Sequence, residues 1–566
     1  MTQPTTAAIH SPPRSRTPRI RSLCAGLLAV FVTAQGCGDG GSGNDGPPGP
    51  KACSAETLEL PPVPLRRLTS RQFNNTLRDL VGDPDFEADV DDTDGLITER
   101  IVRQYRDAAE DLTQRREQWQ REVFPCDISG DEDLDCLANF IQGFGGRAFR
   151  RPPTVDEQKL LTDMFEAARG KDLSFEDAML VVFEMMLQSP ALLYLHEVGG
   201  ANTTDSLRLL TDHEVASRLS YFLWETMPDD DLFGAAAAGK LGSEDGLREE
   251  VQRMLGDPRA EATVQRFFAA WLQLEGGHLH DALEITIKDK ELFPNFEGVP
   301  QAMRRETEAL IHRAFFEEDE NSFATLLTSR DAYVNGALSE LYGVDGPKDD
   351  ESFEWVTLDG KERAGLLTRA AFLTVYASSK VQSPIKRGAW IYREALGGAL
   401  GDPPANVNDN PPLGGEALTI REDVEARTKG AECSGCHTLI NPLGFTFGHY
   451  DAIGRFQTEE IGSGETITAE AEVQSTGFDG VVADAVGLST ELADSIAARE
   501  HFANRWMSLA FAGGGSEELN CESDPLRQGF VDDGDMRKLV VSVISSNTFR
   551  YVAIPTGDPQ PASSQE

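Results

Sequence analysis

Apolar side chains recur at helical spacing through most of this chain. Thr69 and Gln72 form a capping-box pattern, in which each side chain satisfies a backbone N–H at the start of a helix. Apolar residues then return every three or four positions over 73–81, and Gly82 ends the run. The pattern therefore predicts a helix between these two signals. The same kind of capping residue precedes further helical runs at Thr154, Ser174 and Thr211.

Alternation of apolar and polar residues, the pattern of a strand, is scarce. The best candidate for a strand is 466–478, which lies between two glycine-containing segments. Amphipathic stretches at 247–255, 260–274 and 299–317 extend the helical pattern instead. The sequence shows no repeat of fixed period. We therefore predict a mainly α protein built from several small helical modules in tandem.

The N-terminal segment has the pattern of an export signal. Several arginines precede an apolar run over 23–34, which is shorter than the roughly 20 residues that span a bilayer. Cleavage after Ala34 would release a soluble chain, whereas a lipobox over 34–37 would make Cys37 a lipidated N-terminus. The glycine-rich stretch that follows favours the lipoprotein. We expect a signal peptide over 1–37 and a flexible tether over 38–60.

The charge of the chain narrows the classes of partner. Its 566 residues carry 52 basic and 94 acidic side chains, a formal net charge of −42. Nucleic-acid binding depends on clustered Lys and Arg, so this balance excludes that class. It favours a soluble surface and is compatible with a cationic partner.

One motif points to a specific kind of site: Cys433, Cys436 and His437 form Cys-x-x-Cys-His. A short helical turn brings the two sulfurs to the two vinyl groups of a porphyrin, and the next residue offers an imidazole to the iron. A zinc site or a redox dithiol is the alternative, but zinc would need further ligands. Because covalent haem attachment requires export, the export signal favours one haem c, with His437 as the proximal ligand.

The sixth ligand of the iron stays open in the sequence. His449 follows His437 at a distance that allows the chain to fold back, and Met507 would supply a thioether that raises the potential. Each also has a structural interpretation, which we favour: a loop histidine and a core methionine. An open sixth position is the third alternative.

The remaining cysteines suggest disulfides, which persist outside the cytoplasm. Cys126 and Cys136 enclose a short acidic loop and form the most evident pair. Cys53 and Cys521 are a second, open pairing.

Glycine, proline and polar runs divide the chain into units. We predict helical domains at 61–130, 135–200 and 205–345, a cytochrome-c-like domain at 355–460, a C-terminal helical domain at 485–552 and a disordered tail at 553–566.

Short patterns in five of these units resemble one family, the multidomain surface proteins of planctomycetes and myxobacteria. In that family, planctomycete surface domains surround a planctomycete cytochrome c domain. The resemblance implies haem on Cys433 and Cys436, axial ligation by His437, and a place at the cell surface or in the periplasm; it implies no defined substrate. The patterns lie at 66–80, 147–152 with 189–190, 216–224, 433–455 and 545–551.

We expect a lipid-anchored envelope protein that moves electrons outside the cytoplasm, with secretion as the alternative location. Its partner is an unknown redox partner or envelope protein, and it touches the membrane only through the N-terminal lipid. Two alternatives to the electron carrier are a peroxidase-like haem enzyme and a non-catalytic surface scaffold with structural haem or zinc. In the haem module, we expect Pro442 and Gly444 to shape the wall of the haem pocket.

Overall fold

The computed structural model describes most of the chain between residues 58 and 554. All of these residues belong to one compact unit, Ala52–Glu566. The predicted signal peptide, the lipidation site Cys37, almost all of the tether, Cys53, Cys521 and the tail after 554 lie outside the described residues. The structure describes 58, 60, 65–92, 97–129, 134–200, 203–204, 206–272, 282–283, 285–318, 320–401, 418–461, 463–511 and 522–554.

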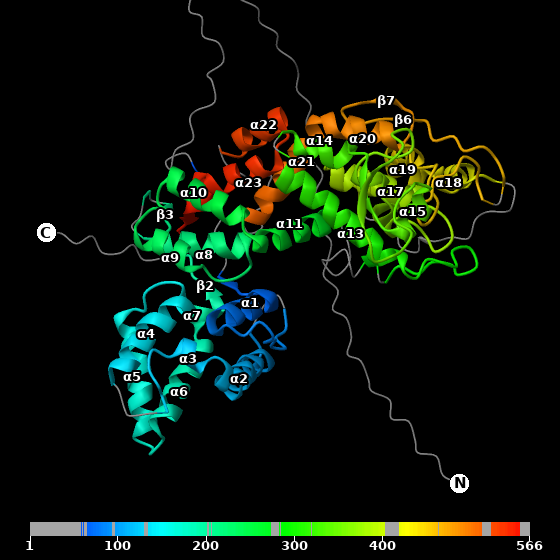
Figure 1. Ribbon diagram of the computed structural model, residues 1–566. Coiled ribbons are helices and arrows are strands. Elements are labelled where there is room, and N and C mark those ends of the chain that lie inside the picture. The colour runs from blue at the N-terminus through cyan, green and yellow to red at the C-terminus, as the bar shows by residue number, and fades with distance from the viewer. Residues whose placement is uncertain are drawn as a thin grey trace, which may run out of the picture. The chain divides into compact units, whose positions relative to one another are not determined.

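Helices dominate these ranges, which confirms the prediction of a mainly α protein with several helical modules (Figure 1). The strands in the described residues form two-stranded sheets only. The strand predicted at 466–478 is shorter in the structure, where β6 (Ala471–Val473) pairs with β7 (Gly480–Val482). None of the described helices is long and apolar enough to cross a membrane.

The first helices pack around one hydrophobic core that runs from Leu68 to Leu195 and also takes in Tyr221 and Met227. The predicted capping boxes at Thr69 and Thr154 are both formed. The segment closes on itself, because β1 (Arg66–Arg67) pairs with β2 (Tyr194–Leu195). Its helices are α1 (Ser70–Val81), α2 (Glu99–Gln114), η1 (Arg116–Gln118), α3 (Gln120–Val123), α4 (Leu134–Phe149), α5 (Val155–Arg169), α6 (Phe175–Leu187) and α7 (Pro190–Leu193).

A disulfide joins Cys126 to Cys136, the pair that the sequence favours, with a sequence separation of 10. It ties the chain after α3 to the first turns of α4. Cys136 is buried in the core described above, whereas Cys126 packs at its edge.

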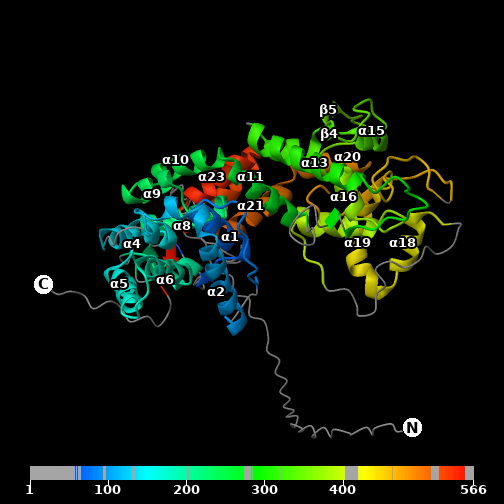
Figure 2. The same ribbon diagram turned by 60° about the horizontal axis from the view of Figure 1, so that its bottom comes forward.

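A second core combines two distant stretches of sequence. The β3 strand (Leu207–Leu209) pairs antiparallel with β8 (Tyr551–Ala553). Helix α23 lies against α10, as Figures 1 and 2 show, and α14 lies against α20, as Figure 1 shows. Residues 207–345 and 485–553 therefore share this core. Its elements are α8 (Asp212–Leu223), α9 (Asp230–Ala237), α10 (Glu244–Leu255), α11 (Pro258–Trp271), α13 (Val299–His312), η3 (Arg313–Glu317), α14 (Ser322–Thr328), β4 (Asp331–Val334), α15 (Gly336–Tyr342), α20 (Ala485–Asp494), α21 (Ile496–Ala510), α22 (Ser523–Asp533), α23 (Met536–Ser545) and α24 (Asn547–Arg550).

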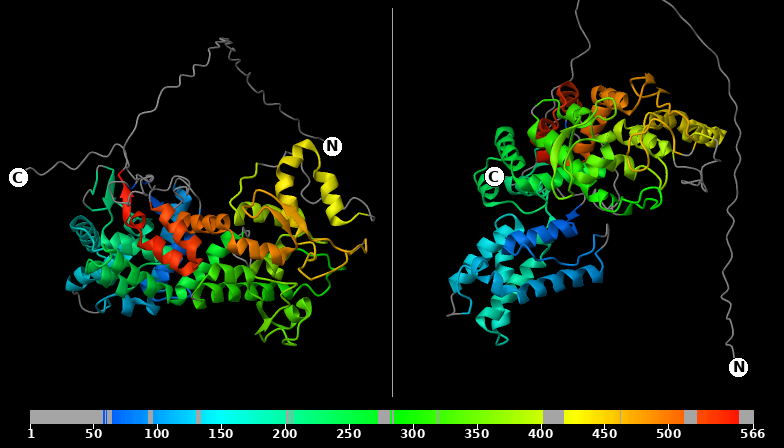
Figure 3. Two further views of the ribbon diagram at one scale, coloured as in Figure 1. Left: turned by 90° about the horizontal axis from the view of Figure 1, so that it is seen from above. Right: turned by 45° about the vertical axis from the view of Figure 1, so that its right-hand side comes forward.

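The segment with the Cys-x-x-Cys-His motif lies between these two stretches in the sequence. It starts at β5 (Glu354–Thr357), which pairs with β4. Trp390, Leu443 and Phe447 from this segment enter the second core. Figure 3 shows its two longest helices in yellow, with the orange loops of β6 and β7 beside them. Its helices are η4 (Leu366–Thr368), α16 (Ala370–Val375), α17 (Pro384–Trp390), η5 (Ile391–Ala395), α18 (Ile420–Thr428) and α19 (Ala431–Phe445).

Candidate haem-attachment site

Helix α19 carries the Cys-x-x-Cys-His motif in its N-terminal half. The helix starts behind Gly430, whose carbonyl oxygen accepts the backbone N–H of Cys433 at 2.9 Å. Because positions i, i+3 and i+4 lie on one side of a helix, Cys433, Cys436 and His437 share one face of α19. Cys433 is half-buried, Cys436 is exposed, and neither forms a disulfide. Both sulfurs are therefore available for a covalent bond.

The imidazole of His437 is held from one side. Its Nδ1 lies 2.8 Å from Oδ1 of Asn441, one helical turn further along α19. Asn441 is itself buried, and its Nδ2 donates to Oγ1 of Thr428 at 2.8 Å. The ring of His437 is therefore anchored through Nδ1, and Nε2 is the nitrogen that is left to bind a metal.

Further along α19, its C-terminal half packs directly against α17. A Cβ atom on Gly444 would lie 1.9 Å from the carbonyl oxygen of Pro384. A Cβ atom on Gly388 would lie 1.9 Å from the carbonyl oxygen of Ile440. The two backbones are thus in contact, which only glycine allows. Gly444 therefore permits the helix crossing that supports the motif, and its expected place in the wall of the haem pocket stays a prediction.

Pro442 stands inside α19. Proline has no N–H, so the usual hydrogen bond to the carbonyl oxygen of Thr438, one turn earlier, cannot form. The part of α19 around Pro442 is buried, as Ile440 and Leu443 show, whereas Cys436 in the N-terminal half of the helix is exposed.

A buried arginine fixes α17 in turn. Arg387 has no exposed surface, and its guanidinium donates to four carbonyl oxygens at 2.8 to 3.3 Å. Burial lowers the pKa of Arg387 to about 9. The carbonyl groups come from α16 and from the chain that follows α19, so this one side chain ties α17 to both of these segments. They belong to Leu373, Phe447, Tyr450 and Asp451.

The geometry of the motif distinguishes between the two groups that it could hold, a zinc ion and haem c. A structural zinc ion needs four ligands that converge on one point. Among the residues that the structure describes, no three or more His, Cys, Asp or Glu side chains converge in that way. Haem c needs instead two sulfurs for two separate vinyl groups and one imidazole for the iron. Two unbonded thiols and an imidazole with an anchored Nδ1, all on one helix face, fit haem c.

His449, one candidate for the sixth ligand, lies in the loop after α19. Its Nδ1 donates to the carbonyl oxygen of Gln457 at 2.9 Å, and its ring stacks on Phe456 with centroids 5.1 Å apart. The ring is half-buried. These contacts give His449 a structural role in the loop, and its Nε2 takes no part in them.

Met507, the other candidate, lies on α21 in the second core. Its side chain has no exposed surface and is enclosed together with Trp506 and Phe502. Ligation of an iron held by the motif of α19 would require the thioether to leave its packing in this core. The structure therefore supports the interpretation of Met507 as a core residue.

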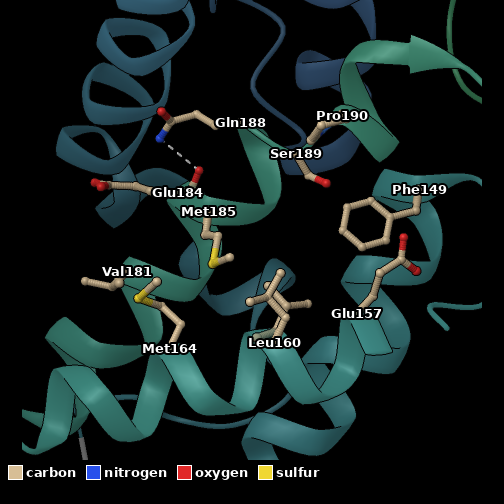
Figure 4. Close-up of a pocket in the computed structure, with 11 residues that line it drawn as sticks. Phe149, Glu157, Leu160, Met164, Val181, Glu184, Met185, Gln188, Ser189 and Pro190 are labelled. Atoms are coloured by element: carbon tan, nitrogen blue, oxygen red, sulfur yellow. Dashed lines mark hydrogen bonds between the residues drawn. The ribbon is translucent and has the colours of Figure 1, made fainter. Parts of the chain in front are cut away.

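A separate groove of about 420 Å³ lies between α5 and α6, as Figure 4 shows. Its walls are mainly apolar, and Leu160 and Met164 are partly exposed along it. Glu157 lies at one end, but its carboxylate already pairs with Arg151 and caps α5. These ties lower the pKa of Glu157 to about 2, chiefly through the hydrogen bond from Arg151. Burial raises the pKa of Glu184, a second carboxyl group that lines the groove, and the contacts of Glu157 and Glu184 do not by themselves indicate a ligand.

Asn441 belongs to the segment that resembles the cytochrome c domain, but the sequence assigned no role to it or to Thr428. The available signal was an amide side chain four residues after the histidine of the motif, which is one helical turn away. Thr428 gave no such signal, because its position beside Asn441 depends on how α18 and α19 pack.

The fold and the site together define a mainly α protein with a cytochrome-c-type module. Three family models match the chain, and each is described as a protein of unknown function: PSCyt3 (DUF1588) at 363–460, PSD4 (DUF1592) at 210–344 and PSD5 (DUF1595) at 136–197. The chain is therefore a multidomain protein of planctomycete-type domains, one of them a planctomycete cytochrome c domain. Neither a curated protein nor a solved structure matches it. The resemblance of 66–80 and 545–551 to such domains stays a prediction.

Proposed function

We propose that this chain is a cell-envelope c-type haem protein that transfers electrons outside the cytoplasm. Cys433 and Cys436 hold one haem c, and His437 ligates its iron through Nε2. The observation that carries the proposal is the face of α19 on which two free thiols adjoin an imidazole held at Nδ1 by Asn441. The haem supplies a redox-active iron, and the chain supplies its attachment, axial ligand and surroundings.

Attachment of the haem needs no reactants other than the haem and the two thiols of this module. Each thiol adds across one vinyl double bond, so that a C–S bond forms and the thiol hydrogen passes to the neighbouring vinyl carbon. The step needs reduced thiols and no oxidant. The exposed Cys436 and the half-buried Cys433 are both unpaired, as the step requires.

The N-terminal pattern and the domain family support the location. The predicted signal peptide over 1–37 would export the chain, and lipidation of Cys37 would anchor it to a membrane. Planctomycete surface-type domains at 136–197 and 210–344 agree with an envelope protein. The helical domains around the haem module would dock a redox partner, and the net charge of −42 favours a cationic one.

A redox titration tests electron transfer. The purified haem protein should change reversibly between oxidised and reduced spectra with a one-electron slope, and ferricyanide should oxidise the reduced form in a single rapid phase. Association with a cationic redox protein should slow as salt is added, because screening weakens attraction between opposite charges. A haem that does not cycle reversibly would contradict the electron carrier.

One observation favours a second candidate. Met507 is fully buried in the second core, which favours a haem without a thioether ligand. An iron with an open sixth position is the arrangement of a peroxidase-like haem enzyme. Carbon monoxide binding to the reduced protein and consumption of hydrogen peroxide distinguish the two functions. Rapid binding with peroxide turnover would favour the enzyme; neither is expected of a six-coordinate carrier.

A further inference from the structure

We propose that Thr428 and Asn441 are positioning residues that fix the tautomer of His437 before haem arrives. This inference rests on the proposed function, since it concerns the nitrogen that binds iron. Neutral imidazole carries its proton on either Nδ1 or Nε2, and only the first form presents a lone pair at Nε2. A device that keeps the proton on Nδ1 therefore prepares the ligand.

The hydrogen bonds form a chain that starts at a backbone carbonyl of α18. Oγ1 of Thr428 donates to the carbonyl oxygen of Val424 at 2.8 Å. Because its one proton is used there, Oγ1 accepts from Nδ2 of Asn441, also at 2.8 Å. Oδ1 of Asn441 then faces Nδ1 of His437 at 2.8 Å. An amide oxygen can only accept, so His437 must donate from Nδ1.

The opposite orientation of the amide is disfavoured by the same distances. Turning Asn441 over would direct the Thr428 proton to Asn441. The hydroxyl oxygen and the Val424 carbonyl oxygen would then face each other at 2.8 Å with no proton between them. Burial adds to this preference: Thr428 is 7% exposed and Asn441 is 6% exposed, so water cannot easily replace a lost partner.

The chain of bonds also has a consequence for the iron. A hydrogen bond from Nδ1–H makes the imidazole a better electron donor through Nε2, and outer partners of this kind hold the ring in place. A more basic ligand favours oxidised over reduced iron. Removal of the bond should therefore raise the midpoint potential, and a stronger acceptor at position 441 should lower it.

The test uses the full chain with two readouts. In haem-free protein, the ¹⁵N shifts of the His437 ring report the tautomer; in haem-loaded protein, a redox titration reports the potential. For Thr428→Val we expect the ratio of Nδ1–H to Nε2–H to fall by about fivefold and the potential to rise, since one neutral hydrogen bond is lost. Asn441→Asp should shift the potential downwards, in the opposite direction.

Two matched variants separate positioning from damage to the fold. Thr428→Ser keeps the hydroxyl and should retain both wild-type readouts. Thr438→Val makes the same substitution on α19, where the hydroxyl donates to the carbonyl oxygen of Ser434 at 2.7 Å and is outside this chain of bonds; it should change neither. The inference is overturned if Thr428→Val keeps the wild-type tautomer and potential, or if Thr438→Val shifts them equally.

Failure of the proposed function and failure of the positioning role would give different results. If wild-type protein takes up no covalent haem, the proposed function fails, while the tautomer in the haem-free chain still decides the role of Thr428. If haem is attached but Asn441→Asp and Thr428→Val shift the potential in the same direction, the positioning role fails and the proposed function stands.

Discussion

Gly388 and Ile440 bring α17 and α19 into backbone contact: a Cβ atom on Gly388 would lie 1.9 Å from the carbonyl oxygen of Ile440. The motif helix is thus supported by the neighbouring helix at a distance that no other residue allows. The buried guanidinium of Arg387, the residue before Gly388, secures the same helix from inside. The position of the haem motif depends on this crossing.

We expect Gly388→Ala to separate the two helices. Overpacking of this kind typically costs about 1–3 kcal/mol, and backbone contact at this distance places Gly388 at the upper end. Urea unfolding followed by circular dichroism measures the loss. Gly435→Ala is the matched control, because a Cβ atom there meets nothing within 4 Å. The control should gain roughly 0.5–1 kcal/mol from its helix propensity. Equal stability of the two variants would contradict the account of the crossing.

Local signals were sufficient to predict where many helices begin. The capping boxes at Thr154 and Thr211 are formed as the sequence predicts, because their partners lie three residues away. The pair of Cys126 and Cys136 is local in the same sense. These features depend on a few adjacent residues, so the sequence alone contains the information.

The features that position the site depend instead on packing between distant segments. Leu207 pairs with Ala553, hundreds of residues away in the sequence, and this pairing joins the two stretches that form the second core. No short sequence pattern predicts it. The hydrogen bond between Thr428 and Asn441 likewise needs the observed angle between α18 and α19. The sequence therefore identified the haem motif but not what holds it. The predicted domain boundaries stay predictions, although the chain on both sides of the haem module contributes to one core.

A buried lysine should make stability depend on pH. Nζ of Lys288 donates to the carbonyl oxygens of Thr374 and Ser378, each at 2.9 Å. Burial is the main reason that its pKa falls from 10.5 to about 7; nearby Arg387 and Lys386 lower it further, and Asp451 opposes them. Because the unfolded chain holds this proton up to higher pH, Lys288 destabilises the fold at pH 7 and below.

The penalty should disappear as the pH rises from about 7 towards 10.5. Over that window, wild-type stability should rise relative to Lys288→Met by up to about 1.4 kcal/mol per pH unit. Chemical denaturation at several pH values measures the difference. Lys380→Met is the control, since Lys380 is largely exposed and pairs with Asp289 at the surface. A constant difference between wild type and Lys288→Met across the window would show that the pKa of Lys288 is not lowered.

The role of Met507 gives a further prediction. Met507→Leu preserves volume and polarity in the core, so it should cost less than about 1.5 kcal/mol. If Met507 is only a core residue, the visible spectrum and midpoint potential of the haem should remain those of the wild type. A marked fall in potential with an altered reduced spectrum would show that the thioether ligates the iron.

The most direct test of the central claim is the intact mass of the exported chain together with its visible spectrum. The chain is produced in a host with haem-attachment machinery, beside a Cys433→Ser, Cys436→Ser double variant and a Ser434→Ala control. We predict a mass increased by one haem, colour that stays on the protein in acid acetone, and a c-type reduced spectrum. The double variant should lose all three, and the control should keep them. An unmodified mass without Soret absorption in the wild-type chain would contradict the account.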